Sequence, residues 1–232
     1  MHRPFRNRTH AGLLLARRLA SYARHPDVVV LALPRGGVPP GAALAQALDV
    51  PLDVVMVRKL ALPEHPEYAV GAVAGDGQSL LQTADIERRG VPAAMLEAAI
   101  ARERAEIVRR ERLYRAHAPP LPLHGKVVIL VDDGIATGST MRLAVRVVRR
   151  AQAARIIVAV PVAAQVSCTE LAHEVDALVC LSSPEPFLSV GQWYRDFRQV
   201  SDEEVVRLLD MARRRRVAAG TGRPAALHSH SH

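Results

Sequence analysis

The sequence predicts an α/β protein with an open, mostly parallel sheet of five strands and helices on both faces. Two observations lead to this prediction. Short apolar runs rich in β-branched residues recur along the chain, as expected for strands buried on both faces of a parallel sheet. Most of these runs are followed by a turn and then by a segment of helical periodicity. The expected strands are residues 28–33, 53–60, 127–131, 155–162 and 177–181.

Helices are expected around and between these strands, because apolar residues recur there every three or four positions. The segment Thr9–Arg24 should cover one face of the sheet. The longest segment, Pro92–His117, carries arginines and glutamates in alternation, which is typical of a solvated crossover helix laced with ion pairs. The other expected helices are residues 41–48, 141–150, 166–174 and 202–213.

A β-hairpin is expected after the second strand. Tyr68–Val73 and Ser79–Gln82 alternate on either side of Gly75-Asp76-Gly77, which is a turn sequence. The preceding residues 61–67 are broken by prolines and are expected to form a flexible loop. Such a loop can act as a lid that excludes water from a reactive centre.

Length and composition favour one domain over residues 1–212, followed by a disordered basic and histidine-containing tail over residues 213–232. The net charge is +8, but five arginines lie in that tail, so the rest of the chain carries 8 − 5 = +3. A surface for nucleic acid would therefore reside mainly in the tail. No apolar run approaches the roughly 18 residues of a membrane span, and a cytoplasmic location with reduced Cys168 and Cys180 is expected.

The segment Val127–Thr140 carries the clearest functional signal. An apolar strand runs directly into Asp132 and Asp133, two carboxylates that can accept hydrogen bonds from vicinal sugar hydroxyls or bind Mg²⁺ through water. The following residues are small, and a helix begins after them, so its unpaired N–H groups can bind a phosphate. The expected phosphate-binding residues are Ala136, Thr137, Gly138, Ser139 and Thr140. The alternative is an ordinary strand-to-helix connection in which the aspartates only cap the turn.

The segment resembles the 5-phosphoribosyl 1-diphosphate signature of the type I phosphoribosyltransferases, in which apolar residues, two acids and Thr-Gly-x-Thr occur in this order. The resemblance implies that Asp132 and Asp133 hold the ribose hydroxyls and organise Mg²⁺, while Ala136–Thr140 wrap the 5-phosphate. The 6-oxopurine enzymes of the family have an aspartate at the position of Ala136, so hypoxanthine and guanine are disfavoured acceptors.

A second glycine-rich loop supports the same interpretation. The first strand runs into Pro34-Arg35-Gly36-Gly37, where backbone N–H groups can converge on an anion and the arginine adds charge. The alternative is a simple Gly/Pro turn before a helix. The loop resembles the pyrophosphate loop of the family, which implies that Arg35, Gly36 and Gly37 receive pyrophosphate and that Arg35–Gly36 is a cis peptide bond.

Two adjacent cations, Arg58 and Lys59, end the second expected strand. Cations at a strand end are often only solvated, but here they belong to a third strand–loop unit, and they can stabilise the charge on a departing diphosphate. We therefore include both residues in the expected catalytic group.

Aromatic residues form only 3% of the chain, yet four of them gather at Phe187, Trp193, Tyr194 and Phe197. The resemblance implies a small hood that holds the acceptor, here approximately residues 183–200 with the N-terminal segment. Phe187 and Trp193 are the expected acceptor contacts. The alternative, that these rings pack the last strand under the helix of residues 202–213, remains open.

The sequence thus predicts an enzyme that transfers the phosphoribosyl group of 5-phosphoribosyl 1-diphosphate to a nitrogenous acceptor with Mg²⁺, and we expect a homodimer. The segments Phe5–Arg8 and Val190–Phe197 are similar to a group of phosphoribosyltransferases without an assigned acceptor. Two other functions stay open. The chain could sense the ligand and bind nucleic acid through its tail, or it could be a nucleotide or phosphate-ester hydrolase that uses the same site.

Overall fold

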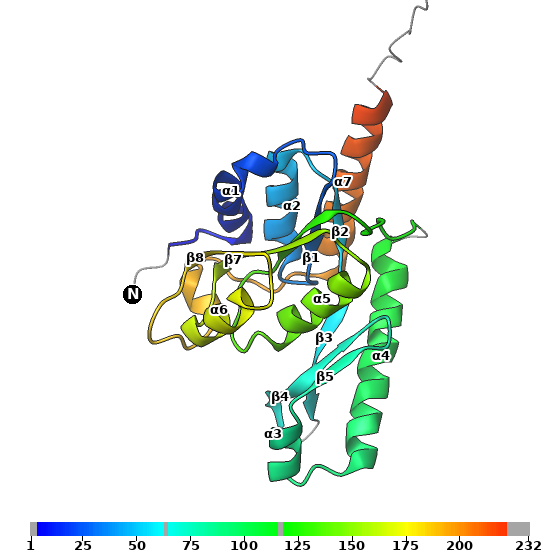
Figure 1. The fold of residues 1–232 in the computed structure, drawn as a ribbon, viewed down its shortest axis with the longest axis vertical. Helices are drawn as coiled ribbons and strands as arrows, with labels where there is room; N and C mark the ends of the chain where they lie inside the picture. The colour runs from blue at the N-terminus through cyan, green and yellow to red at the C-terminus, as the bar shows by residue number, and fades with distance from the viewer. Residues whose placement is uncertain (1–3, 63–64, 116–117, 222–232) are drawn as a thin grey trace, which may run out of the picture.

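The core of the fold is a five-stranded sheet in the order β2-β1-β6-β7-β8, and all its strand pairs are parallel. The computed structural model describes residues 4–62, 65–115 and 118–221 (Figure 1). The predicted α/β class and the parallel sheet are therefore confirmed. The strands are β1 (Val28–Ala32), β2 (Leu52–Val54), β6 (Val127–Val131), β7 (Arg155–Val162) and β8 (Ala177–Ser182).

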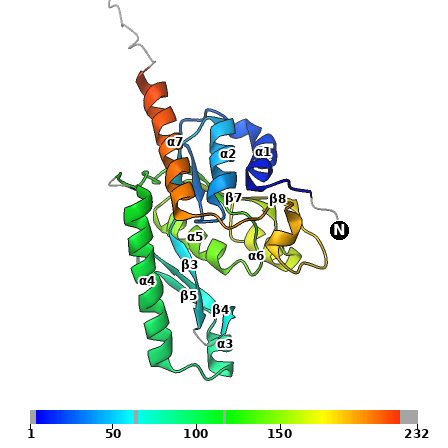
Figure 2. The ribbon, with the colours of Figure 1, turned by 180° about the vertical axis from the view of Figure 1, so that it is seen from behind.

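The sheet is buried on both faces because its strands are almost entirely aliphatic. Along β1, Val28 and Val30 pack on one face and Val29 and Leu31 on the other. The first face is covered by α1 (Arg8–Arg18), α2 (Val38–Leu48) and α7 (Asp202–Thr221), and the second by α5 (Ser139–Arg150) and α6 (Gln165–Ala172) (Figure 2). Two short 3₁₀ helices complete this part: η1 (Ala20–Tyr22) and η2 (Val190–Trp193).

A second, smaller sheet extends away from the body (Figure 1). It has the order β3-β4-β5, is antiparallel, and packs against α4. The strands β4 and β5 form the hairpin expected from the sequence. The elements of this part are β3 (Val57–Leu62), β4 (His65–Ala74), β5 (Ser79–Leu81), α3 (Thr83–Arg88) and α4 (Ala93–Arg115).

The expected strand of residues 53–60 is wrong as a single element. The chain forms β2 in the parallel sheet, breaks at residues 55–56, and continues as β3 in the antiparallel sheet. Consequently the expected lid at residues 61–67 is largely strand, since β3 ends at Leu62 and β4 begins at His65; residues 63–64 lie outside the described residues. The apolar residues 54–57 continue through the break, so the sequence pattern does not reveal the change of sheet.

The expected disordered tail is also partly wrong, because α7 continues through Arg213 to Thr221. Arg213 donates to the carbonyl oxygen of Tyr114 at 2.9 Å and bonds Asp210 at 3.1 Å, so its side chain joins α7 to the end of α4. Residues 222–232 lie outside the described residues. None of the described helices is long and apolar enough to cross a membrane.

Candidate functional site

Two loops meet at the carboxyl edge of the parallel sheet. β1 and β6 are neighbours, and the N–H of Leu33 donates to the carbonyl oxygen of Val131 at 2.9 Å, which extends their pairing to the last residue before each loop. Residues 34–37 therefore lie beside Asp132 and Asp133, although about a hundred residues separate them in the chain. Ligands of open α/β sheets bind at this edge.

The two loops touch closely enough that only glycine fits between them. A Cβ atom on Gly36 would lie 2.2 Å from Oδ2 of Asp133, and one on Gly37 would lie 2.6 Å from the carbonyl oxygen of Val131. Close approach thus explains the glycine pair better than turn flexibility does. The cis peptide bond of this loop joins Pro34 and Arg35, one residue before the expected Arg35–Gly36 bond.

The acidic pair lies in a largely desolvated place at this edge. Oδ1 of Asp132 accepts from the N–H of Asp133 at 2.8 Å, so this residue also shapes the turn. Burial raises the pKa of Asp132 well above its ordinary value, and the neighbouring Asp133 carboxylate raises it further. Burial also raises the pKa of Asp133, against the opposing effect of Arg8.

The N-terminal helix supplies the cation beside Asp133. Nε of Arg8 donates to Oδ2 of Asp133 at 2.7 Å, and the two side chains are only 11% and 14% exposed. The guanidinium lies 3.7 Å from the centre of the Phe197 ring and also donates to the carbonyl oxygen of Arg198. Arg8 thus connects α1, the acidic pair and the aromatic segment.

The turn after the acidic pair leads into α5 as expected. Gly138 adopts a positive φ of 75° and precedes the first helical residue, and no side chain caps this helix start. The N–H groups of the first turn are therefore suited to an anion. Ser139 is already engaged, since its hydroxyl accepts from Nε2 of Gln82 at 3.2 Å and lies 3.4 Å from that of Thr137.

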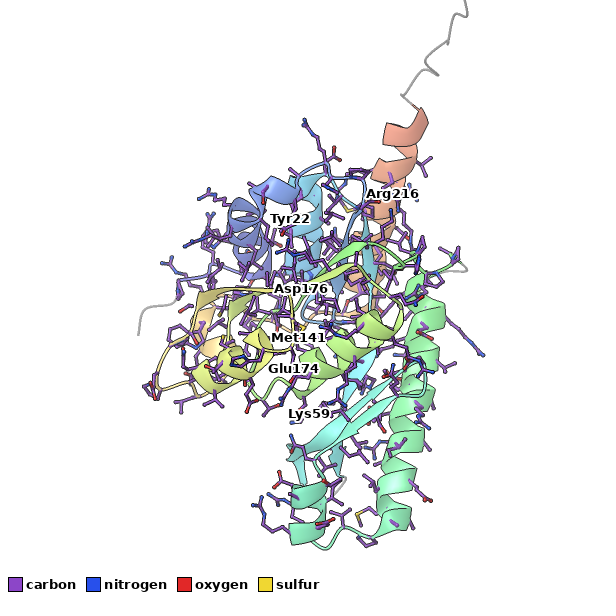
Figure 3. All side chains as sticks on the ribbon, in the orientation of Figure 1. Tyr22, Lys59, Met141, Glu174, Asp176 and Arg216 are labelled. Atoms are coloured by element: carbon purple, nitrogen blue, oxygen red, sulfur yellow. The ribbon has the colours of Figure 1, made fainter. Side chains whose placement is uncertain are left out.

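A cavity of about 250 Å³ opens at this edge between the two sheets. It brings residues from all three predicted segments together, and its lining includes Pro34, Arg58, Lys59, Asp132 and Thr140. Figure 3 shows Lys59 on β3, where the small sheet meets the body. The cations therefore reach the site from the antiparallel sheet and not, as expected, from the end of a parallel strand.

The three predicted cations have different environments. Arg58 forms an ion pair of 2.6 Å with the nearly buried Glu103 of α4, which is a structural contact. Arg35 points toward the start of α7, where its Nη1 lies 3.9 Å from Oδ1 of Asp202. Lys59 is exposed and lines the cavity together with the half-buried Arg58. Lys59 is therefore better placed than Arg58 to meet a diphosphate.

The predicted hood residues gather beside the acidic pair. The N–H of Phe5 donates to the carbonyl oxygen of Trp193, and Phe187 and Trp193 are half-buried around Phe5 and Tyr194. Within the described part of the chain, the buried side-chain polar atoms without a hydrogen-bond partner are Oε1 of Gln192 and Nε1 of Trp193. Both belong to η2, which packs on Gly134: a Cβ atom there would lie 2.5 Å from Val190.

Sequence reasoning assigned no role to three residues of this site. Arg8 pairs with an aspartate 125 positions away, the hydroxyl of Tyr194 donates to the carbonyl oxygen of Asp133 at 2.5 Å, and Asp202 contacts Arg35. The sequence signals were weak: Arg8 belongs to the Phe5–Arg8 segment and Tyr194 to the aromatic group, but nothing in the sequence paired either with Asp133.

Known proteins share this architecture. The chain is 42% identical over 216 residues to Rv0571c of Mycobacterium tuberculosis H37Rv, which is named as an inferred phosphoribosyl transferase; the match covers 93% of this chain and 48% of that protein. The chain thus spans about half the length of its curated relative. The crystal structure of TT1426 from Thermus thermophilus is 41% identical with a TM-score of 0.73, over 90% of this chain and 98% of that one.

The sequence profile of the phosphoribosyl transferase domain matches residues 8–192, which include the acidic pair, the glycine loop and Lys59. This match covers well over half of the chain, and it agrees with the edge-of-sheet site described above. The chain therefore belongs to the phosphoribosyl transferase domain family.

Proposed function

We propose that the protein transfers the 5-phosphoribosyl group of 5-phosphoribosyl 1-diphosphate to a nitrogenous acceptor and releases pyrophosphate. The observation that supports this most directly is the cavity that is lined at once by Asp132 of the acidic pair, Thr140 at the start of α5, and Lys59. A sugar between two phosphate groups needs these three chemistries together: acceptors for hydroxyls, amides for one phosphate, and a cation for the other.

Each group has a defined task in the proposed reaction. Asp132 and Asp133 accept hydrogen bonds from the ribose hydroxyls, and the first-turn amides of α5 bind the 5-phosphate. The glycine loop of residues 34–37 and Lys59 bind the diphosphate. The acceptor nitrogen attacks the anomeric carbon as the bond from that carbon to the diphosphate oxygen breaks, and the electron pair leaves with pyrophosphate.

The acidic pair also fits a Mg²⁺ ion. Burial raises the pKa of both aspartates although Arg8 pairs with Asp133, so a further positive charge beside Asp132 would be favourable. No group of three potential ligands from His, Cys, Asp and Glu occurs among the described residues, which suits Mg²⁺, because this ion commonly uses one or two carboxylates plus phosphate oxygens and water. When bound, Mg²⁺ would neutralise charge on the diphosphate.

The acceptor is proposed to bind under the hood. Phe187 and Trp193 border the acidic pair through Tyr194, and their half-buried rings offer flat surfaces on which a planar nitrogenous ring can stack. This arrangement supports a nitrogenous acceptor as a class without selecting one compound.

The test combines an acceptor screen with a matched pair of variants. The protein is incubated with labelled 5-phosphoribosyl 1-diphosphate, Mg²⁺ and a panel of nitrogenous bases, and ribosylated product and pyrophosphate are measured. Asp133→Asn should lower turnover by roughly 100-fold or more. Asp49→Asn removes a carboxylate that is 74% exposed, at a left-handed position that asparagine tolerates, and should leave turnover unchanged. Equal activity of both variants, or pyrophosphate release that needs no acceptor, would reject the proposal.

A further inference from the structure

A groove of about 540 Å³ runs along α7 next to α4 and reaches the candidate site only at Asp202, the first residue of the helix. Leu113 and Met211 in this groove are 40% and 44% exposed, which is high for large apolar side chains. Six of the α7 residues that line it recur at spacings of three or four, and so form one stripe on the helix. They are Glu203, Val206, Arg207, Asp210, Met211 and Arg214.

The stripe is complementary to itself when it is followed in the opposite direction. From its start the residue types are acid, apolar, base, acid, apolar and base. Reversed, each acid meets a base and each apolar residue meets an apolar one: Glu203 with Arg214, Val206 with Met211, and Arg207 with Asp210. All three pairs are centred on the same point of the helix, between Leu208 and Leu209. A two-fold axis at that point would form every pair twice.

We propose that two copies of the protein form a homodimer across this groove, with their α7 helices antiparallel around that axis. Val206 and Met211 of the two copies would fill the apolar centre beside Leu113, and the charged pairs would flank it. The antiparallel orientation also places the acidic first turn of one helix beside the arginines of the other. The stripe's own acids disfavour an anionic partner such as nucleic acid.

Contacts within one chain are compatible with this arrangement. Oδ1 of Asp210 accepts from Arg213 at 3.1 Å, and a carboxylate has capacity for a second donor. NH1 of Arg207 lies 3.6 Å from the sulfur of Met211, so both side chains already lie along the groove. The end of α7 projects from the body, with Arg216 on the projecting part (Figures 1 and 3), and Val217 is 68% exposed.

The first test is the molar mass in solution, measured by light scattering and sedimentation over a range of protein concentrations. The wild-type chain should show twice its mass of 25.2 kDa. Glu203→Arg and Arg214→Glu should each raise the dissociation constant of the dimer by about tenfold or more, because each replaces two attractive contacts by two repulsive ones. The double variant restores opposite charges and should restore the dimer. Circular dichroism checks that each variant is folded.

The matched control is Arg216→Glu, an identical charge change on the opposite side of the same helix, two residues after Arg214. It should weaken the dimer far less than Arg214→Glu does. A wild-type monomer at all concentrations would overturn the proposal. So would a dimer that is insensitive to both single reversals, or a double variant no better than either one.

Cross-linking tests the pairing directly. Arg207→Cys and Asp210→Cys are prepared separately and mixed, and a short bis-maleimide is added. The mixture should give a linked dimer well above the background of the wild-type chain, whose Cys168 and Cys180 are half-buried, and above a mixture that contains Arg216→Cys instead. Equal yields in the two mixtures would contradict the antiparallel arrangement. The proposed dimer does not depend on the proposed reaction, so one proposal can be wrong while the other is right.

Discussion

Asp132 and Asp133 are adjacent in the chain but differ in their neighbours. Asp133 has the guanidinium of Arg8 at 2.7 Å, whereas Asp132 accepts from a backbone N–H of the turn and lines the cavity. Burial raises the pKa of both. Desolvated carboxylates destabilise a fold unless a cation compensates them, and here Arg8 supplies one cation for the pair.

Asp132→Asn is predicted to stabilise the metal-free protein. The folded-state pKa of Asp132 lies above its ordinary value of 3.8, so its ionisation costs stability as the pH rises through the interval between these two values. At neutral pH the variant should therefore have a higher free energy of unfolding than the wild-type chain. The gain should vanish as the pH falls toward 3.8. Denaturant titrations at several pH values measure it, and a loss of stability at neutral pH would contradict the assignment.

Arg8→Gln is predicted to have the opposite effect. Removing the guanidinium leaves the ionised Asp133 without its cation, which should cost about 2 kcal/mol of unfolding free energy at neutral pH. The cost is present while Asp133 is ionised and is lost as the pH falls through its raised pKa. Arg6→Gln changes an exposed arginine two residues earlier and serves as the control. Equal losses of unfolding free energy in Arg8→Gln and Arg6→Gln would show that the Arg8–Asp133 pair has no specific effect on stability.

At the scale of elements, the most consequential event is the transfer of the chain from one sheet to the other after β2. The residues of β3 pair with β4 and not with the parallel sheet. This brings Lys59 to the cavity from the side and turns Arg58 toward Glu103 of α4. Both cations line the cavity, but Arg58 also pairs with a carboxylate of α4, so we expect the two side chains to contribute differently to stability.

The different roles of these cations can be tested with two matched variants. Arg58→Gln should lower the free energy of unfolding by about 2 kcal/mol, since it removes the partner of a nearly buried carboxylate that Arg102 contacts only at 3.1 Å. Lys59→Gln should change stability by less than about 0.5 kcal/mol but lower kcat/KM by about tenfold or more. Thermal unfolding and steady-state kinetics separate the two effects. If Arg58→Gln lowered mainly kcat/KM and Lys59→Gln lowered mainly the free energy of unfolding, the assigned roles would be wrong.

At the scale of the whole molecule, the candidate site draws its residues from distant parts of the fold. The acidic pair and glycine loop end neighbouring strands, Arg8 comes from α1, and Lys59 comes from the outer sheet. A ligand in the cavity would therefore connect both sheets. Anything that binds only the folded state stabilises it by mass action.

With Mg²⁺, 5-phosphoribosyl 1-diphosphate at about 100 times its Kd is predicted to raise the free energy of unfolding by about 2.7 kcal/mol. For a chain of this size the Tm should rise by roughly 5 to 10 °C. Scanning calorimetry measures the change, with ribose at the same concentration as a control that should leave the Tm unchanged. No shift at millimolar ligand would argue against the proposed substrate.

The sequence by itself determined the parallel sheet, most of its helices, the hairpin and the acidic pair, because each depends on local patterns: aliphatic runs, helical periodicity and a short motif. It also placed the glycine loop, but the reason for Gly36 is the Asp133 carboxylate across the crevice.

Only the tertiary structure decided which residues meet there. It divided the strand of residues 53–60 between two sheets, extended α7 past Arg213, moved the cis bond to Pro34–Arg35, and paired Arg8 with Asp133. Such outcomes depend on contacts between segments distant in sequence, and no local pattern encodes their geometry.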